Sequence, residues 1–297
     1  MTTVLERPQE SEQITRRRFA SLGSLGPGER ILRYFLLVFV LVITVGPFLW
    51  ELSTSLKGAG EDIYTATPTF VPHQPTLHNY AEVARAIPVW RYIGNSLLVA
   101  ALTVGGNILF ATTAGYAIAR LRFRGRKVVL GLFLATLVLP GEVTIISQYV
   151  TVRDFGFADS LIGVALPGMV AALNVLLMYN AFRGLPQEVD EAAIVDGATV
   201  PQRLLRVSLP AVRGTLAVVA IFAFIQAWDD FLWPLIVLTS PEKYTLTVGL
   251  QYLSGTFTQD QRLISAGTMI AFIPIAILFS ALQRYFFKGV EEGGVKG

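Results

Sequence analysis

The sequence predicts an all-α membrane protein with six transmembrane helices, cytoplasmic amino and carboxy termini, and a large cytoplasmic loop between helices four and five. First, 53% of the 297 residues are hydrophobic and 15% are charged, with a mean hydropathy of +0.55, whereas ordinary soluble domains carry about 25% charged residues. Second, apolar stretches long enough to cross a bilayer recur along the chain. Third, Lys and Arg are concentrated in alternate connecting segments.

Six stretches qualify as spans, because a helix needs about 20 mostly apolar residues to cross a bilayer. They are approximately Ile31–Trp50, Ile93–Ala119, Val128–Val150, Leu161–Phe182, Gly214–Leu238 and Leu263–Phe286. Pro140, Gly141 and Glu142 interrupt the third stretch, and Asp229 and Asp230 interrupt the fifth. Both stretches remain long enough to span, and each carries a polar feature that lipid would not tolerate.

The distribution of basic residues predicts the orientation. Of the 24 Lys and Arg residues, 18 lie in residues 1–33, 120–127, 183–213 and 284–296, and six lie in the alternate segments. Because short cytoplasmic loops are enriched in Lys and Arg, both termini are predicted to lie inside. The same assignment places residues 183–213 in the cytoplasm.

The chain divides into a tail and one membrane domain. Residues 1–30 are polar and contain Thr15–Phe19, which superficially matches a twin-arginine export signal. A full-length apolar span follows instead of a short apolar region with a cleavage site, so the segment is predicted to be a disordered cytoplasmic tail. Residues 31–297 form the membrane domain, since the largest outside loop, about Glu51–Tyr92, is too short for a domain of its own.

Several kinds of chemistry are excluded. The chain has no cysteine and only two histidines, His73 and His78, in one polar loop. Disulfides, thiolate metal sites and histidine-based catalysis are therefore not expected, nor is a catalytic site, a metal or a cofactor. No Gly-x-x-x-x-Gly-Lys phosphate loop is present. The net charge of +3 does not suggest a nucleic-acid partner.

Asp229 and Asp230 are candidate pathway residues, because carboxylates at membrane depth usually face a bundle interior or an aqueous path. In a continuous fifth helix, Gln226, Asp230 and Trp233 would share one face at i, i+4 and i+7. Such a carboxylate, amide and aromatic set could hold a polyhydroxylated ligand. The alternative stays open that these residues lie near the outer interface, with Trp228 and Trp233 as interfacial aromatics.

Two other spans carry notable residues. Glu142, directly after Pro140-Gly141, has two open interpretations: a broken helix beside a pathway, or an unwound turn packed against a neighbouring span. Ala111, Gly115 and Ala119 recur every four residues and predict a helix-packing face.

The cytoplasmic loop carries the most specific pattern. Pro186 stands at the start of a predicted short helix, Glu188, Asp190 and Glu191 place negative charge in its first turn, and Gly197 ends it.

A second short helix is predicted directly afterwards. Thr199 and Gln202 have the spacing of a capping box, Leu204 and Leu205 begin an apolar stripe, and Pro210 ends it. Two short helices would therefore meet at a glycine elbow. The ordinary alternative is an amphipathic loop resting on the membrane surface.

At these residues the chain resembles the inner-membrane permease subunits of binding-protein-dependent ABC importers. That family's motif is Glu-Ala-Ala, three residues, Gly, nine residues, then Ile-x-Leu-Pro. Here it reads Glu191-Ala192-Ala193, Gly197, and Val207-Ser208-Leu209-Pro210, with Val207 as the single departure. Further stretches resemble the sugar-importing branch of that family: Asn95-Ser96, Leu139–Gly141 and Trp228–Pro234. The chain end, Phe287–Gly297, resembles that of the maltose-type second permease.

The resemblance, which covers about residues 31–297, implies a set of partners. The loop would be a coupling helix seated in one of two ATP-binding cassette subunits, where Glu191 meets a basic residue and Gly197 allows the turn, with Glu291–Gly297 as a second contact. The other partners would be a second permease subunit in a heterodimer, an extracytoplasmic solute-binding protein, membrane lipid, and a di- or oligosaccharide or a related polyol or glycerol phosphate. The location would be the cytoplasmic (inner) membrane of a prokaryote. Many relatives have an amide-acid pair where this chain has Asp229-Asp230.

A different class of function remains as the alternative. A self-contained secondary transporter could use Asp229, Asp230 and Glu142 for coupling to protons or cations. A carboxylate-dependent membrane enzyme is a weaker third interpretation, because few ionisable residues lie at membrane depth.

Overall fold

The computed structural model describes residues 26–61, 63, 69–257 and 260–294, and every regular element in these residues is helical. The α-helices are α2 (Pro27–Ser55), α3 (His78–Ala86), α4 (Val89–Arg120), α5 (Arg126–Thr136), α6 (Ile145–Asp154), α7 (Leu161–Gly168), α8 (Ala172–Gly184), α9 (Gln187–Val195), α10 (Val200–Gln202), α11 (Leu209–Ala211), α12 (Arg213–Asp229), α13 (Leu232–Val237), α14 (Leu246–Tyr252) and α15 (Gln261–Gly294). Short 3-10 and π segments are η1 (Gly141–Thr144), η2 (Arg203–Ser208), η3 (Pro241–Lys243) and η4 (Leu253–Phe257).

Three continuous helices are long and apolar enough to cross a membrane: Gly28–Ser55 in α2, Val89–Arg120 in α4 and Gln261–Gln283 in α15. Three further helix pairs pass the same test but are bent, so the described residues contain three spans, or up to six if each bent pair is one span. α2 begins at Pro27, before the predicted boundary at residue 31. Residues 1–25 of the predicted tail and the last three residues of the chain lie outside the described residues.

The third predicted span is not one straight helix. α5 ends at Thr136, and the η1–α6 segment leaves at 102° to it. Pro140 supplies no backbone N–H and has an extended conformation, with φ −60° and ψ 131°, so the helix cannot continue through it. The interruption lies where Pro140-Gly141 predicted it. Of the two interpretations that the sequence left open for Glu142, the structure shows the broken helix, and α5 with η1–α6 counts as one span only as a bent pair.

The fifth predicted span is also divided. α12 ends at Asp229, Asp230 is extended with ψ 126°, and α13 starts a new helix at Leu232. The expectation of one helix over residues 214–238 is therefore wrong at its carboxy-terminal end. A second pair, Val200–Ala211 and Arg213–Asp229, meets at 86°, which turns the chain from the loop into α12.

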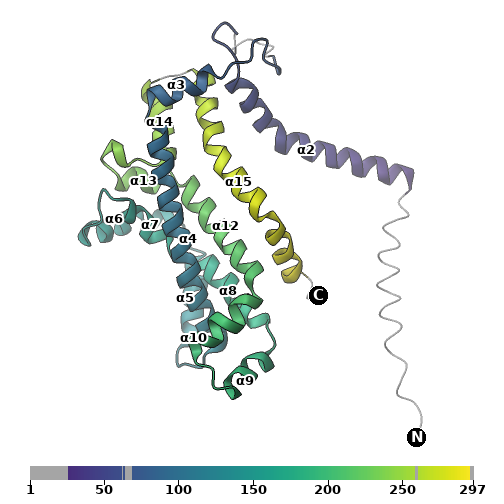
Figure 1. Ribbon diagram of the computed structural model, residues 1–297, viewed down its shortest axis with the longest axis vertical. Helices are drawn as coiled ribbons and strands as arrows, with labels where there is room; N and C mark the ends of the chain where they lie inside the picture. The colour runs from purple at the N-terminus through teal and green to yellow at the C-terminus, as the bar shows by residue number, and fades with distance from the viewer. Residues whose placement is uncertain (1–25, 62, 64–68, 258–259, 295–297) are drawn as a thin grey trace.

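Helix α4 runs through the middle of the molecule beside α7, α8 and α12 (Figure 1). Glycines allow the closest approaches: a Cβ added at Gly106 would lie 2.5 Å from the Met169 Cβ, and one at Gly115 would lie 2.7 Å from the Met178 Cβ. Ala111 is fully buried. The small-residue packing face predicted around Gly115 is confirmed at these positions.

Asn107, at the middle of α4, compensates for a break in its neighbour. α7 and α8 are bent by 45° around residues 169–171, which frees backbone groups inside the membrane domain. The fully buried Asn107 amide donates to the Gly168 carbonyl at 2.7 Å, and its Oδ1 accepts from the Ala171 N–H at 3.1 Å and from Asn174 Nδ2 at 2.9 Å. One amide therefore satisfies both sides of the break.

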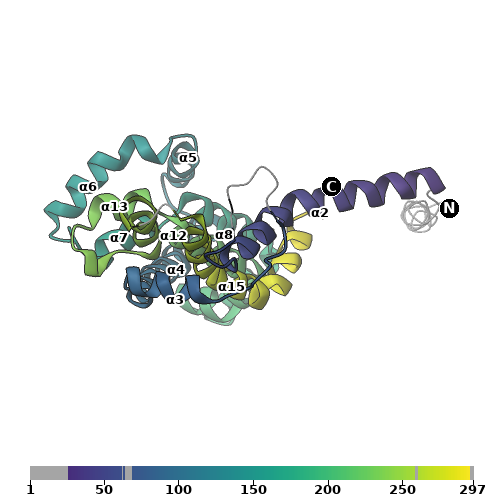
Figure 2. The same cartoon turned by 90° about the horizontal axis from the view of Figure 1, so that it is seen from above.

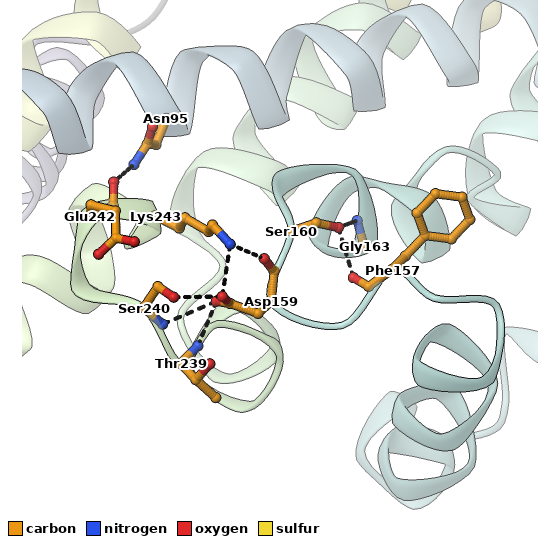
Figure 3. A network of polar contacts seen from close by, with 9 residues as sticks. All are labelled: Asn95, Phe157, Asp159, Ser160, Gly163, Thr239, Ser240, Glu242 and Lys243. Carbon is orange, nitrogen blue, oxygen red and sulfur yellow. Dashed lines mark hydrogen bonds and ion pairs between the residues drawn. The ribbon is translucent and has the colours of Figure 1, made fainter.

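The end of the molecule that carries α3 and α14, called here the α14 end, holds a network around Asp159 (Figure 3). The Asp159 carboxylate accepts from the backbone N–H groups of Thr239 and Ser240 at 2.9 and 3.0 Å, and from Lys243 Nζ at 2.8 Å. The hydrogen bond from Lys243, followed by that from the Ser240 hydroxyl, holds the pKa of Asp159 well below its usual range. Asp159 has a left-handed backbone, with φ 48°, which Asp tolerates better than most residues. The network joins the α6–α7 loop to the α13–α14 loop.

Helix α2 leaves the rest of the fold. Figures 1 and 2 show it running outward from the α14 end, and its apolar side chains from Ile31 to Ile43 are all more than half exposed or close to it. Its last turns pack against α15, where the rings of Phe48 and Phe272 lie 5.1 Å apart. Most of this apolar helix is therefore uncovered by the described residues.

Candidate functional site

The α9–α10 loop lies at the end of the molecule opposite to α14, called here the α9 end (Figure 1). α9 ends in a Schellman motif: the Ala198 N–H donates to the Ala193 carbonyl at 2.9 Å, and the Gly197 N–H donates to the Ile194 carbonyl at 3.0 Å. Gly197 has a φ of +76°, a conformation that favours glycine. The predicted glycine elbow is confirmed.

The second short helix begins as its sequence predicts. The Thr199 backbone N–H donates to Gln202 Oε1 at 2.8 Å, which is half of a capping box. The helix continues through η2, a π-helical segment, and through α11 to Ala211, one residue beyond Pro210. π-Helical turns are rare and occur frequently at functional sites.

The surface of the elbow is partly apolar. Val195 is 87% exposed, Leu205 60% and Ile194 54%, although they lie on a short polar loop. Of the motif residues, Glu191, Ala192, Gly197 and Pro210 are exposed, Val207 and Leu209 are half-buried, and Ala193 is buried. The small side chain of Ala193 allows α9 to lie close against the rest of the loop, while Glu191 stays accessible.

Polar contacts connect α9 to the membrane helices. Asp190 Oδ1 accepts from the Tyr116 hydroxyl of α4 at 3.3 Å, and Asp190 Oδ2 lies 3.7 Å from Arg203 Nη1. The Tyr116 ring packs edge-on against Phe182 of α8, with ring centroids 5.4 Å apart. These contacts join α9 to α4 and, through the Tyr116 ring, to α8. The sequence marked Asp190 only as a first-turn acid, and neither Tyr116 nor Arg203 carries a pattern that would reveal this contact.

A second candidate site is a cavity of about 480 Å³ between α4, α7, α12 and η1. Gln226, Asp229, Asp230, Trp233 and Glu142 all line it. The structure thus brings together every residue that the sequence singled out for a pathway, including Glu142 from a different span. An adjoining hollow of about 780 Å³ shares Gln226. These volumes lie in the usual range for sites that hold small ligands.

The prediction that Gln226, Asp230 and Trp233 lie on one face of a continuous helix is wrong. Gln226 and Trp233 do not share a helix face, because the helix breaks at Asp230. Instead, the break turns both side chains toward one cavity. Asp230 Oδ1 accepts from the Trp233 backbone N–H at 3.3 Å, and the Asp230 carbonyl accepts from the Thr247 hydroxyl at 2.7 Å.

Trp228 and Trp233 are not exposed as interfacial aromatics would be. They are 2% and 7% exposed, and their indole N–H groups donate to the Ala271 and Val164 carbonyls at 3.0 and 3.1 Å. Both rings pack inside the protein, so the interfacial interpretation is wrong for this chain.

Two further residues acquire a reason for their positions. Asn95 Nδ2 donates to the carbonyls of Glu242 and Tyr244, both at 3.0 Å, and the Ser96 hydroxyl accepts from the Leu246 N–H at 2.8 Å. The Asn-Ser pair that opens α4 therefore holds the start of α14. Among the described residues, no group of three or more His, Asp or Glu side chains is placed to hold a metal ion.

The helical architecture and the two sites define a membrane protein of the permease class, with an accessible loop at one end and a polar cavity among its helices. A family model, described as the binding-protein-dependent transport system inner membrane component, matches residues 107–292. The chain belongs to this family, and is a multi-pass protein of the cell membrane.

Curated relatives and solved structures agree with this assignment. The chain is 33% identical to the sulfoquinovosyl glycerol transport system permease protein SmoH of Agrobacterium fabrum, over 90% of this chain and 94% of that protein. It is equally identical to the arabinooligosaccharides transport system permease protein AraQ of Halalkalibacterium halodurans, over 87% and 94%. A bacterial ABC transporter involved in the import of the acidic polysaccharide alginate has the same fold, with a TM-score of 0.77 over 89% of this chain and 99% of that one, at 23% identity.

Proposed function

We propose that the chain is a permease subunit of an ATP-driven, binding-protein-dependent importer for a di- or oligosaccharide, or for a related polyol or glycerol phosphate. The observation that carries this is the exposed α9–α10 elbow, which is joined by side chains to α4 in a member of the permease family. The printed names of the relatives support the substrate class, since they include transport systems for arabinooligosaccharides and maltodextrin. The chain itself is non-catalytic, and ATP hydrolysis belongs to its partners.

The α9 end is the cytoplasmic end in this proposal, as the distribution of Lys and Arg predicts. The elbow is seated in an ATP-binding cassette subunit. Glu191 meets a basic residue there, and the exposed Ile194, Val195 and Leu205 supply the apolar part of the contact. ATP-driven closure of two such subunits then moves α9, and with it α4 and α8, between inward-open and outward-open arrangements.

The remaining partners follow from the shape of the chain. Most of α2 is apolar and uncovered, as a helix that lies against lipid or a second permease subunit would be. The cavity lined by Gln226, Asp229, Asp230 and Trp233 is half of the substrate path, and the second subunit supplies the other half. An extracytoplasmic binding protein delivers the sugar to the α14 end. Glu291–Gly297, part of which lies outside the described residues, is a second contact with the ATPases.

Substitution of Glu191 or Gly197 tests the coupling loop. Glu191→Lys reverses the charge offered to the ATPase, and Gly197→Arg forces a bulky residue into a φ of +76°. Both changes should release the ATPase during detergent extraction or separate ATP hydrolysis from uptake. Glu188→Lys is the matched control, because Glu188 is an exposed acid of the same helix outside the motif. Normal uptake with the ATPase bound in both variants contradicts the assignment.

One observation favours a second candidate, an ion-coupled secondary transporter: Glu142, Asp229 and Asp230 line the same cavity. Three carboxylates at membrane depth are a common arrangement in proton and cation pathways. Liposomes that contain this chain alone decide between the two. Uptake driven by an ion gradient would support the secondary transporter, whereas the importer gives none without its ATPases and binding protein.

A further inference from the structure

Arginines gather around a hollow at the α9 end, beside the α9–α10 loop, and neither candidate function gives these arginines a ligand. The hollow has a volume of about 520 Å³ and lies between the end of α4, the start of α5, the end of α8 and α9. Five arginines line it: Arg120, Arg122, Arg126, Arg183 and Arg203. Asp190 and Glu191 are the carboxylates that line it, so positive charge is in excess. We call it the arginine hollow.

Two of these arginines keep buried N–H donors without an acceptor. Arg120 Nη2 donates to the Phe182 and Leu185 carbonyls at 2.7 and 2.6 Å, but its Nε is buried and has no hydrogen-bond partner among the described residues. Arg203 has an 11% exposed side chain, lies 3.7 Å from Asp190, and also has a buried Nε without an acceptor in the part of the chain that is described. Buried donors of this kind usually have a partner. The enrichment of cytoplasmic loops in Lys and Arg does not explain these buried arginine groups, because that enrichment requires only basic residues near the surface.

The other side of the hollow is an exposed basic turn beside apolar residues. Arg122 is exposed, and Arg126 donates only to the Ala119 carbonyl, at 3.1 Å, among the described contacts. Both arginines also line a neighbouring hollow of about 670 Å³ around Phe123. Phe123 is 42% exposed, and Val128 and Leu132, one turn apart on α5, are 66% and 63% exposed. Cationic groups and an open apolar helix face are therefore adjacent.

We propose that the arginine hollow binds the headgroup of an anionic phospholipid. Arg122 and Arg126 meet the phosphate, Arg120, Arg183 and Arg203 add positive charge around it, and the acyl chains lie along Val128 and Leu132 of α5. The guanidinium fork matches phosphate oxygens, and basic pockets between membrane helices bind anionic headgroups. The shared chemistry is a phosphate group, and the apolar face of α5 selects a lipid rather than free phosphate.

The lipid site would lie beside the α9–α10 loop, but lipid binding would not depend on the proposed contact of that loop with an ATPase. Asp190 contacts Tyr116 of α4 and Arg203 of η2, and Asp190 and Arg203 both line the hollow. The site stands or falls by lipid binding measured directly, so its failure is distinguishable from failure of the proposed importer function.

The test measures retained lipid by native mass spectrometry. The full-length chain, with the subunits that copurify with it, is placed in vesicles of phosphatidylcholine with or without phosphatidylglycerol and then extracted in mild detergent. Phosphatidylglycerol should be retained in preference to phosphatidylcholine. The double variant Arg122→Gln, Arg126→Gln should retain phosphatidylglycerol about thirtyfold more weakly. Arg91→Gln with Arg153→Gln is the control, because it removes two exposed arginines far from the hollow.

Three results overturn the proposal: equal retention of both lipids, unchanged retention in the double variant, or an equal loss in the control. A further arm adds excess inorganic phosphate during extraction. If phosphate displaces the lipid and is itself found bound, the hollow is a free-phosphate site and the lipid proposal fails. If the double variant does not assemble, Arg122→Gln alone decides, since Arg122 is exposed and makes no hydrogen bond or ion pair among the described residues.

Discussion

At the scale of single residues, Asp230 combines two functions at the break between α12 and α13. Its carboxylate accepts the Trp233 backbone N–H and so caps the first turn of α13. The same side chain lines the central cavity, beside Asp229 and Gln226. Asp230 thus lies between the two helices, caps the second one, and presents a negative charge to the proposed sugar path.

Substitutions of Asp230 separate these functions. Asp230→Asn keeps an oxygen for the cap and removes the charge, whereas Asp230→Ala removes both. Asp230→Ala should lower stability by about 1 kcal/mol, because the cap is lost, and both variants should lower sugar uptake roughly tenfold while the complex still assembles. Asp229→Asn is the comparison, since Asp229 lines the same cavity. Uptake with unchanged apparent affinity and rate in both Asp230 variants would leave Asp230 with the capping role alone.

Asp159 makes a second prediction at this scale. Asp159→Asn should lower the free energy of unfolding by about 1–2 kcal/mol near pH 7, because the carboxylate accepts from Lys243 and from two backbone N–H groups. The folded pKa is depressed, so this stabilisation is fully present above the unfolded value near 3.9 and is lost as pH falls toward the folded value.

Thermal unfolding in detergent between about pH 3.5 and about pH 8 measures this contribution, because the lower end of the range reaches the ordinary Asp pKa of about 3.9. The difference between wild type and variant should be constant from about pH 5 upward and should shrink below about pH 4. Asp154→Asn is the control, because Asp154 is exposed and pairs only with the adjacent Arg153 among the described contacts. A difference that grows as the pH falls would contradict the assignment.

At the scale of elements, close contact between α4 and the α7–α8 pair depends on glycine. A Cβ at Gly106 would lie 2.5 Å from the Met169 Cβ and 3.0 Å from its Cα, and backbone cannot move away cheaply. Gly106→Ala should therefore destabilise the fold by about 1–3 kcal/mol. Gly105→Ala is a matched control on the same helix, since a Cβ there meets no atom within 4 Å. Equal thermal stability of the two variants would show that α4 and α8 can separate without cost.

The elements also show what could be predicted from sequence. The elbow at Gly197 and the cap at Thr199 were predictable because both depend on neighbouring residues in the chain. The break at Asp230 was not, because the apolar pattern continues through residues 231–238 and the contacts that stabilise the break come from Thr247 and Val164. The apolar stretches around Asp229 and Glu142 were enough to predict that both lie within spans, but only the fold shows that they line the same cavity.

At the scale of the whole molecule, the described residues leave a long apolar helix uncovered. α2 extends from the α14 end with its apolar side chains exposed, and the central cavity lies beside the η1–α6 segment, which is itself mostly exposed (Figure 1). Hydropathy could predict the three continuous spans in α2, α4 and α15, because each needs only a long apolar stretch, whereas bent helix pairs account for up to three further spans. The direction in which α2 leaves the fold is a property of what it packs against, and that information is not local to residues 27–55.

Asn107 has a geometric consequence for the whole molecule. It holds α4 to the α7–α8 break near the middle of a rod that is about 48 Å long. If α4 turned as a stiff rod about Asn107, its two ends would move in opposite directions. From Asn107 the arms measure about 20 Å toward the α9 end and about 27 Å toward the α14 end. In such a turn, a shift of about 3 Å at the short arm gives about 4 Å in the opposite direction at the long arm, so α4 would move inward at one end while it moves outward at the other.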